Sequence, residues 1–182
     1  MMDNLGLYGT IDWLVAKVKK LCCIVENLQN QQQLYYGSYF STQDQINTVG
    51  GVLAMTVNNT DFQNGISISG TGSEIVIANA GKYNIQFSAQ LHHRSGGGSG
   101  KHVDIWFAKN GVKIADSNTR VDVDTNTPYQ VAAWNYFVDA AAGDKYEIMW
   151  TTENASIVIE QEPANATHPA TPSVIITVNR IG

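Results

Sequence analysis

The chain has 182 residues and a formal net charge of −5; 43% of its residues are hydrophobic and 15% are charged. This hydrophobic fraction suffices for a packed core and argues against intrinsic disorder, and the length fits one domain with an appendage. A nucleic-acid partner is not expected, because such binding needs a basic face and no basic run here is longer than KVKK.

The first residues, MMDNLGLYGT, lack the positively charged start and the continuous apolar stretch of a signal peptide. No run of about 18 apolar residues follows, so we expect no membrane insertion. The chain is therefore expected to be made in a cytoplasm, and to stay there or leave it as part of an assembly or by lysis.

Residues 11–33, IDWLVAKVKKLCCIVENLQNQQQ, are predicted to form a helix with Thr10 or Asp12 as its N-cap. Its apolar residues recur at steps of three and four, which is the a/d heptad pattern of helices that pack together. Residues 1–34 are therefore interpreted as a stem for oligomerisation and docking. The residues predicted to carry this role are Ile11, Leu14, Val18, Leu21, Val25 and Leu28.

The packing of this stem remains open between four arrangements. Ile or Val at a with Leu at d favours a two-stranded coil. Val15, Cys22 and Ile24 widen the apolar face, as three strands or a helix laid on another surface would need. Packing of the helix on its own β domain is the fourth arrangement. The adjacent Cys22 and Cys23 point in different directions on a helix and are interpreted as buried, reduced thiols that act as small apolar residues.

Residues 35–182 are predicted to form an all-β head, because short segments alternate apolar and polar residues between turn signals. An Asn-Gly pair at Asn110-Gly111 predicts a tight hairpin. About ten strands without crossover helices indicate a sandwich or barrel. The strands are expected in YYGSYF, GISIS, EIVIA, KYNIQFSAQL, HVDIWFAK, VKIAD, YQVAAWNYFVDA, KYEIMW, SIVIEQE and SVIITVNRI.

Aromatic residues are dense in these segments, and in IWF and WNYF they occupy both faces of a strand. A sandwich buries one face of each strand, so rings on the other face predict a subunit interface, with a large core as the alternative. The residues predicted to lie at a head subunit interface or in the core are Tyr83, Phe87, Trp106, Trp134, Tyr136 and Trp150.

The segment ANAGKYNIQFSAQL resembles the central-strand signature of the tumour-necrosis-factor (TNF) and complement-globular-head superfamily, with Gly81, Tyr83 and Phe87 on the pattern. DIWFAKNGVKIADS resembles the following hairpin and PSVIITV the last core strand. With MTVNNTDFQNGISI, VAAWNYFV and GDKYEIMW, these segments resemble jelly-roll domains of tailed-phage virion proteins, including fibre and capsid-decorating proteins. The resemblance covers about residues 36–181. There is no collagen-like stalk, and a long loop, HHRSGGGSGKH, replaces a tighter connection.

The resemblance implies a TNF-like jelly-roll β-sandwich of about ten antiparallel strands that forms a homotrimer. We therefore expect a structural virion surface protein of a tailed phage, in the head fibre or in a tail component. Its stem would dock on other virion proteins, and its head would display loops to a host-surface glycan or protein. The expected contact loops are residues 41–51, 92–102 and 121–129. The alternative is a bacterial complement-like, lectin-type trimer outside a virion.

Motifs for chemistry are weak, so no enzyme activity and no cofactor are expected. SGGGSGKH fails the phosphate-loop pattern, since Ser95 and His102 stand where glycine and a hydroxyl residue are required. Glu147, Glu153, Glu160 and Glu162 could supply a glycosidase pair, but no two are singled out.

Two metal-site candidates receive little weight. Asp122, Asp124 and Asn126 begin like a calcium loop, but the glycine and glutamate that complete it are missing. His92, His93 and His102 flank the long loop and are interpreted as solvated. No metal is therefore expected.

Overall fold

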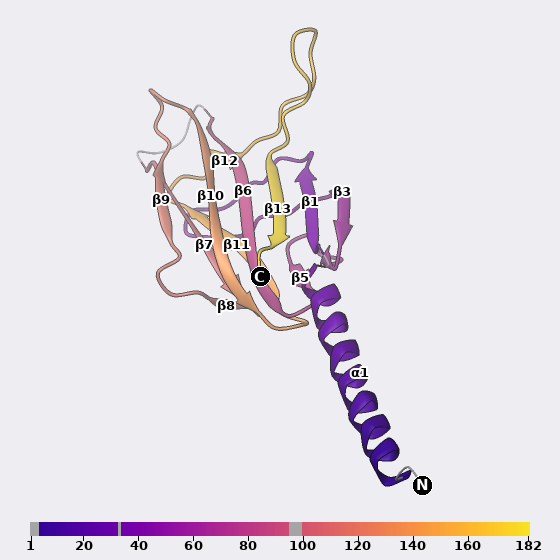
Figure 1. The fold of residues 1–182 in the computed structure, drawn as a ribbon. Helices are drawn as coiled ribbons and strands as arrows, with labels where there is room; N and C mark the ends of the chain where they lie inside the picture. The colour runs from indigo at the N-terminus through magenta and orange to yellow at the C-terminus, as the bar shows by residue number, and fades with distance from the viewer. Residues whose placement is uncertain (1–3, 33, 95–99) are drawn as a thin grey trace. The chain divides into compact units, whose positions relative to one another are not determined.

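The computed structural model describes residues 4–32, 34–94 and 100–182, and the chain divides into two compact units, residues 1–34 and 35–182. The first unit contains helix α1 (Asn4–Gln32), drawn in indigo in Figure 1. Because α1 begins well before Ile11, neither Thr10 nor Asp12 caps it, contrary to the sequence-based prediction. Among the helical residues described, no segment is both long and apolar enough to span a membrane.

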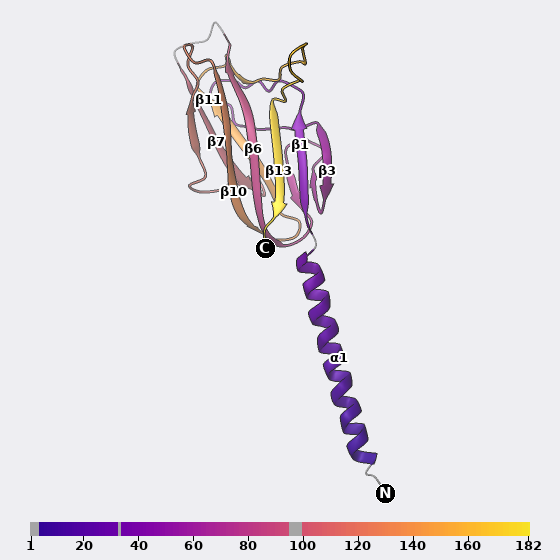
Figure 2. The ribbon, with the colours of Figure 1, turned by 45° about the horizontal axis from the view of Figure 1, so that its top comes forward.

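The second unit is a sandwich of two antiparallel sheets (Figures 1 and 2). Sheet A has the strand order β10-β6-β13-β1-β3, and β12 also pairs with β6. Its strands are β1 (Tyr36–Ser41), β3 (Asn59–Asn64), β6 (Gly81–His93), β10 (Tyr129–Ala140), β12 (Ile157–Ile159) and β13 (Val174–Arg180).

Sheet B has the order β4-β5-β11-β7-β8, with β2 on β11 and β9 on β7. Its strands are β2 (Leu53–Ala54), β4 (Ile66–Ile68), β5 (Ile75–Ile77), β7 (His102–Lys109), β8 (Val112–Lys113), β9 (Thr119–Asp122) and β11 (Lys145–Thr152). The chain passes repeatedly from one sheet to the other, so the two halves of the core come from strands that are distant in sequence.

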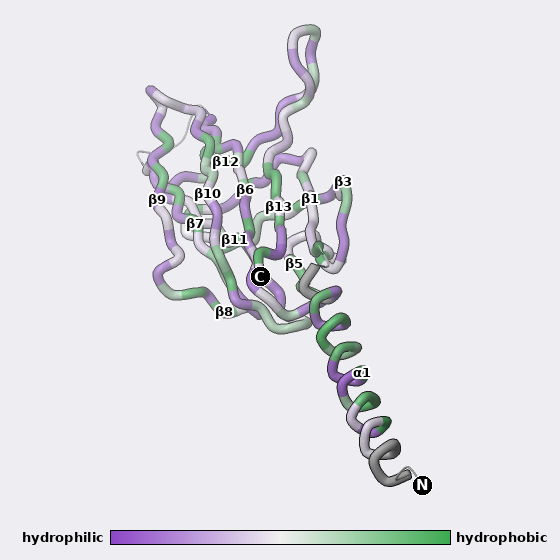
Figure 3. The backbone as a smooth tube through the Cα atoms, in the orientation of Figure 1, coloured by the Kyte–Doolittle hydropathy of each residue, from purple (hydrophilic) through white to green (hydrophobic). Residues whose placement is uncertain are grey.

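The core lies between the sheets and follows from strand alternation. In β6, Tyr83, Ile85 and Ala89 are fully buried, whereas Gln86 between them is exposed. In β11, Tyr146, Ile148 and Trp150 point inward in the same way. Figure 3 shows the resulting changes between hydrophobic and hydrophilic residues along the strands.

The strand pattern agrees with the sequence-based prediction for the apolar segments. Asn110 and Gly111 have φ values of 52° and 78°, as a two-residue hairpin of the primed type requires. The described residues contain thirteen strands, more than the ten or so expected, because β2, β3 and β9 have little apolar alternation and were not predicted.

Candidate functional site

The helix α1 carries its a/d residues on an exposed stripe. Each of the six residues of this heptad stripe is about half exposed, between 45% and 59%. Cys22 and Cys23 are exposed, contrary to the prediction of buried thiols, because residues 9–29 of the helix are all exposed. Lys17 lies over the Trp13 ring, with its Nζ 5.5 Å from the centroid. The residues of the heptad stripe are Ile11, Leu14, Val18, Leu21, Val25 and Leu28.

The aromatic residues predicted for the core or an interface fall into three groups. Tyr83, Phe87 and Trp150 are buried in the core. Trp134 and Tyr136 are partly buried and pack against it, with Trp134 edge-on to Phe87 at 4.6 Å between ring centroids. Trp106 is partly exposed on the solvent face of sheet B.

Large apolar side chains gather on the solvent face of sheet A, most of them at residues that the sequence argument did not single out. Three are on β10 at one edge of the sheet, two are on β1 and β3 at the other edge, and one is on β13 between them. Tyr36 and Phe62 touch, with ring centroids 5.7 Å apart. We call this set the apolar face: Tyr36, Phe62, Tyr129, Val131, Phe137 and Ile175.

The centre of the same face is polar and shallow. Asn135 on β10 donates a hydrogen bond to the Asn84 side chain on β6, at 3.1 Å. Small side chains leave hollows of about 400 Å³ beside Ala133 and about 170 Å³ beside Ser88, and Gln86 lies between these hollows and lines both. The face therefore combines large exposed side chains with two hollows, one along β10 and β6 and one along β6 and β13.

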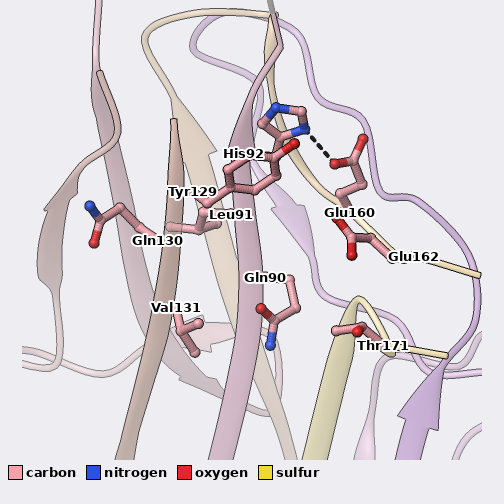
Figure 4. A pocket seen from close by; sticks show the side chains of 9 residues that line it. All are labelled: Gln90, Leu91, His92, Tyr129, Gln130, Val131, Glu160, Glu162 and Thr171. Carbon is pink, nitrogen blue, oxygen red and sulfur yellow. Dashed lines mark hydrogen bonds and ion pairs between the residues drawn. The ribbon is translucent and has the colours of Figure 1, made fainter. Parts of the chain in front are cut away.

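A further hollow of about 260 Å³ lies where β6, β10 and β12 meet (Figure 4). The His92 ring stacks on Tyr129, with centroids 4.1 Å apart and planes 15° apart, and its Nδ1 is hydrogen-bonded to Glu160. The residues that line it are Gln90, Leu91, His92, Tyr129, Gln130, Val131, Glu160, Glu162 and Thr171.

Arg94 links this hollow to the loop after β1 through contacts with two carboxylates. Its Nε donates to Glu160 at 2.9 Å, and its guanidinium also pairs with Asp44. The hydrogen bond to Glu160, followed by that to Asp44, raises the pKa of Arg94. Burial pushes the pKa of Asp44 upward, but hydrogen bonds from the Gln161 amide and from Arg94 outweigh it, so that pKa is lowered.

Glu160 and Glu162 thus line one hollow, the arrangement that a carboxylate pair would need. Both oxygens of Glu160 are engaged, Oε1 by Arg94 and Oε2 by His92. This geometry is that of a structural ion-pair network, and the absence of enzyme activity stays a prediction.

The three histidines beside the long loop point to different partners. His93 is buried, contrary to the interpretation of solvated residues, with Nδ1 2.8 Å from the Val123 carbonyl and Nε2 3.1 Å from the Asn154 amide. His102 pairs with Asp122 at 2.5 Å. Residues 95–99 of the rejected phosphate-loop motif lie outside the described residues.

The candidate calcium residues also have other partners. Hydrogen bonds from Lys101 and His102 lower the pKa of Asp122. Asp124 accepts hydrogen bonds from the amides of Asn126 and Thr127, which lower the pKa of its carboxyl. Across the described ranges, no cluster of three or more His, Cys, Asp or Glu side chains could hold a metal ion.

The described parts of the three expected contact loops lie at one end of the sandwich, the upper end in Figure 1. The long β12–β13 connection projects from the same end and was not singled out by sequence reasoning. Asn165 folds its tip by accepting hydrogen bonds from the amides of Thr167 and His168, at 2.8 and 3.2 Å. Its signal was present in PANATHPATP, where prolines and an Asn turn interrupt two apolar segments.

Comparison with solved structures finds proteins of similar architecture. Crystal structures of murine APRIL at pH 8.5 and pH 5.0 each match with a TM-score of 0.53 and with 9% and 7% sequence identity, and one at pH 8.0 matches with 0.54 and 9%. Each match covers 82% of this chain and 100% of the APRIL chain. No protein-family model matches the sequence, and neither does any curated protein.

Identities this low show the fold alone. The predicted all-β, TNF-like jelly-roll sandwich preceded by one N-terminal helix is confirmed.

Proposed function

We propose that the chain is a homotrimeric binding and display protein whose subunits meet through the apolar face of sheet A. The observation that carries this proposal is the set of six large apolar side chains on that face, of which Phe137 is 61% exposed. Monomeric proteins rarely leave such a surface in water, because its burial stabilises an assembly.

The distribution of side chains on the face favours a ring. A cyclic trimer joins two different patches of neighbouring copies, whereas a two-fold dimer joins a patch to itself. Here the β10 edge carries Val131 and Phe137 on either side of the hollow beside Ala133. The hollow beside Ser88 and the ring pair of Tyr36 and Phe62 lie towards the other edge, so the two halves of the face differ. Large side chains of one copy can therefore fill the hollows of the next.

The heptad stripe supports the same stoichiometry for the stem. A stripe of apolar residues at a and d buries itself when parallel copies of the helix pack together. Val15 and Ile24 are exposed beside the stripe and widen it, which suits three helices better than two. Once bundled, the stem is available to dock on a neighbouring protein.

We further propose that this trimer belongs to the virion surface of a tailed phage and that its stem binds other virion proteins. The support for this setting is the resemblance of residues 36–181 to jelly-roll domains of such virions. The loops at one end of the head would then face a host-surface glycan or protein. A bacterial lectin-type trimer outside a virion is the alternative. If the unchanged chain is incorporated into phage particles and Leu14→Asp is not, this alternative is excluded.

Native mass, measured by light scattering on a sizing column, tests the trimer. The full chain is expected to show three chains. In a Leu14→Asp background, in which the stem cannot bundle, Phe137→Asp is expected to show a single chain with an unchanged β-sheet circular dichroism spectrum. Val112→Asp in the same background is the matched control, because Val112 is 69% exposed on β8 of the other sheet. A monomeric full chain, or a Leu14→Asp/Phe137→Asp variant that remains trimeric, would refute the proposed interface.

A further inference from the structure

The solvent face of sheet B carries an extended groove on the side of the sandwich opposite the apolar face. A hollow of about 580 Å³ and one of about 270 Å³ share Asp104 and Thr151 and therefore form one continuous depression. The larger hollow is lined by Asp104, Trp106, Lys113, Ile114, Ala115, Asp116, Asn118 and Thr151, and the smaller adds Val49, Gly50, His102, Thr152 and Glu153.

Trp106 supplies the aromatic surface of the larger hollow. The neighbouring residues Ile105 and Phe107 are fully buried in the core, so alternation along β7 points Trp106 to the solvent face. Its cross-strand partner on β11 is Met149. A partly exposed tryptophan outside the core offers a flat apolar surface with a polar N–H, which is typical of binding sites.

Polar groups beside Trp106 are held in fixed positions. Arg120 on β9 binds Asp104 through two hydrogen bonds of 3.0 and 2.8 Å, and Asn118 donates a third at 3.1 Å. The Arg120 hydrogen bonds are the main reason that the pKa of Asp104 is lowered. Because the carboxylate is neutralised by its guanidinium partner, this part of the groove presents hydrogen-bonding groups without a net charge.

The segment between β8 and β9 forms one wall of the groove and is held in place by a buried hydroxyl. The hydroxyl of Ser117, a buried residue, donates to the Ile114 carbonyl at 2.8 Å and accepts from the Phe107 amide at 3.1 Å. Asp116 at the rim has a φ of 58°, a conformation that Asp tolerates better than most residues. The rim also balances Lys113 against Asp116.

We propose that this groove binds a neutral oligosaccharide. Sugar rings present a C–H face that packs on an aromatic plane and hydroxyls that both donate and accept hydrogen bonds. Trp106 provides the plane, the Asp104 and Asn118 oxygens accept, and the Thr151 hydroxyl does either. The charges of the larger hollow cancel, since Lys113 offsets Asp116 and Arg120 offsets Asp104, and this suits a neutral ligand. The smaller hollow adds one carboxylate, Glu153, and the two joined hollows suit several sugar units in a row. This site does not depend on the oligomeric state.

Saturation-transfer NMR and isothermal titration on the full-length chain test this site. The neutral probes are cellohexaose, maltohexaose, mannohexaose and chitohexaose. Hyaluronan and polygalacturonate fragments are the anionic comparisons. At least one neutral probe is expected to bind, and Trp106→Ala is expected to weaken that binding about tenfold or more. Asn118→Ala should weaken it less, because one hydrogen bond is lost while the aromatic surface remains.

Trp13→Ala is the matched control, since Trp13 is an exposed tryptophan of helix α1, and it should bind like the unchanged chain. Circular dichroism and native mass of each variant exclude loss of fold. The proposal is overturned if no neutral probe binds, if only anionic probes bind, or if Trp106→Ala binds normally. Native mass of the same samples reports separately on the trimer, so binding by a monomer would refute the proposed trimer and leave the groove intact.

Discussion

Tyr39 anchors β1 to the start of β4 through one buried hydroxyl. The residue is fully buried, and its hydroxyl donates to the Ile66 carbonyl at 2.9 Å, with Gln63 Oε1 at 3.1 Å. Gly37 makes room for this ring, because a Cβ at Gly37 would lie 2.3 Å from the Tyr39 hydroxyl oxygen. β1 therefore needs a glycine here for close approach.

Tyr39→Phe is expected to lower the free energy of unfolding by about 1 kcal/mol or more, since the buried carbonyl loses its donor. Burial raises the pKa of Tyr39 from 10.0 to about 12. The folded state therefore favours the protonated phenol, and this contribution is fully present below pH 10 and is lost as pH rises through about 12.

Urea unfolding of both proteins across this pH range provides the measurement. The advantage of the unchanged chain over Tyr39→Phe should shrink as pH rises from 10 towards 12. A difference that stays constant, or grows, contradicts the assignment of a buried neutral phenol.

Asp144 organises the turn between β10 and β11. Its carboxylate accepts from the Ala141 amide at 2.7 Å and the Asn110 side chain at 2.9 Å, and it pairs with Lys109 at 2.7 Å. The Lys109 hydrogen bond, followed by that from Asn110, lowers the pKa of Asp144. One carboxylate thus joins the β7–β8 hairpin to the β10–β11 connection between the two sheets.

Asp144→Asn should reduce the free energy of unfolding by about 1 kcal/mol, because an ionised acceptor is replaced by a neutral amide. The pKa of Asp144 is lower in the folded state, so the advantage of Asp is present above its ordinary value of 3.8 and is lost as pH falls through the folded value. Thermal melting between neutral and acidic pH measures it, with Asp139→Asn at an exposed site as control. Equal losses in the two variants would contradict the role of Asp144.

At the scale of elements, α1 and β10 both expose apolar residues in a regular pattern. In β10, Trp134 and Tyr136 alternate with the exposed Asn135 and Phe137. Period two along a strand and steps of three and four along a helix each place one set of side chains on one face. Each element therefore offers one face to a partner. A substitution that places one charged residue on that face tests whether the face is buried in an interface.

Leu14→Asp places a charge in the heptad stripe, and it should prevent bundling of the stem and incorporation into particles. Ala16→Asp is the matched control, because it adds the same charge to the same helix off the stripe. Residues 35–182 form a compact unit of their own, so β-sheet circular dichroism should remain unchanged. Incorporation of the Leu14→Asp variant at the level of Ala16→Asp would refute the docking role.

At the scale of the whole molecule, assembly links stability to chain concentration. A trimer that dissociates as it unfolds gains stability by mass action, so its Tm rises with concentration. We expect this rise for the full chain by scanning calorimetry, and we expect a lower, concentration-independent Tm for the Leu14→Asp/Phe137→Asp variant, in which both proposed contacts are removed. A concentration-independent Tm in both proteins would show that the subunits do not stabilise one another.

The apolar strands and the helix were predictable because their signal is local. The run KYNIQFSAQL alternates over its whole length, and β6 occupies these residues with little extension. By contrast, β3 has the sequence NTDFQN and is a strand because it pairs with β1, which no local pattern indicates. The site was predicted less well, since which rings face outward depends on which sheet each strand joins.

The sequence by itself determined an all-β domain after one helix with a heptad stripe, because periodicity and turn residues act over a few positions. The TNF-like jelly roll was implied by the resemblance of particular segments to that superfamily. Only the tertiary structure decided where the surfaces lie. Trp134 packs against the core, whereas Phe137 faces solvent. Trp106 lines one groove together with Asp104, Asn118 and Thr151. The physical reason is that these neighbours are brought together by pairing between strands far apart in the chain, where local patterns carry no information.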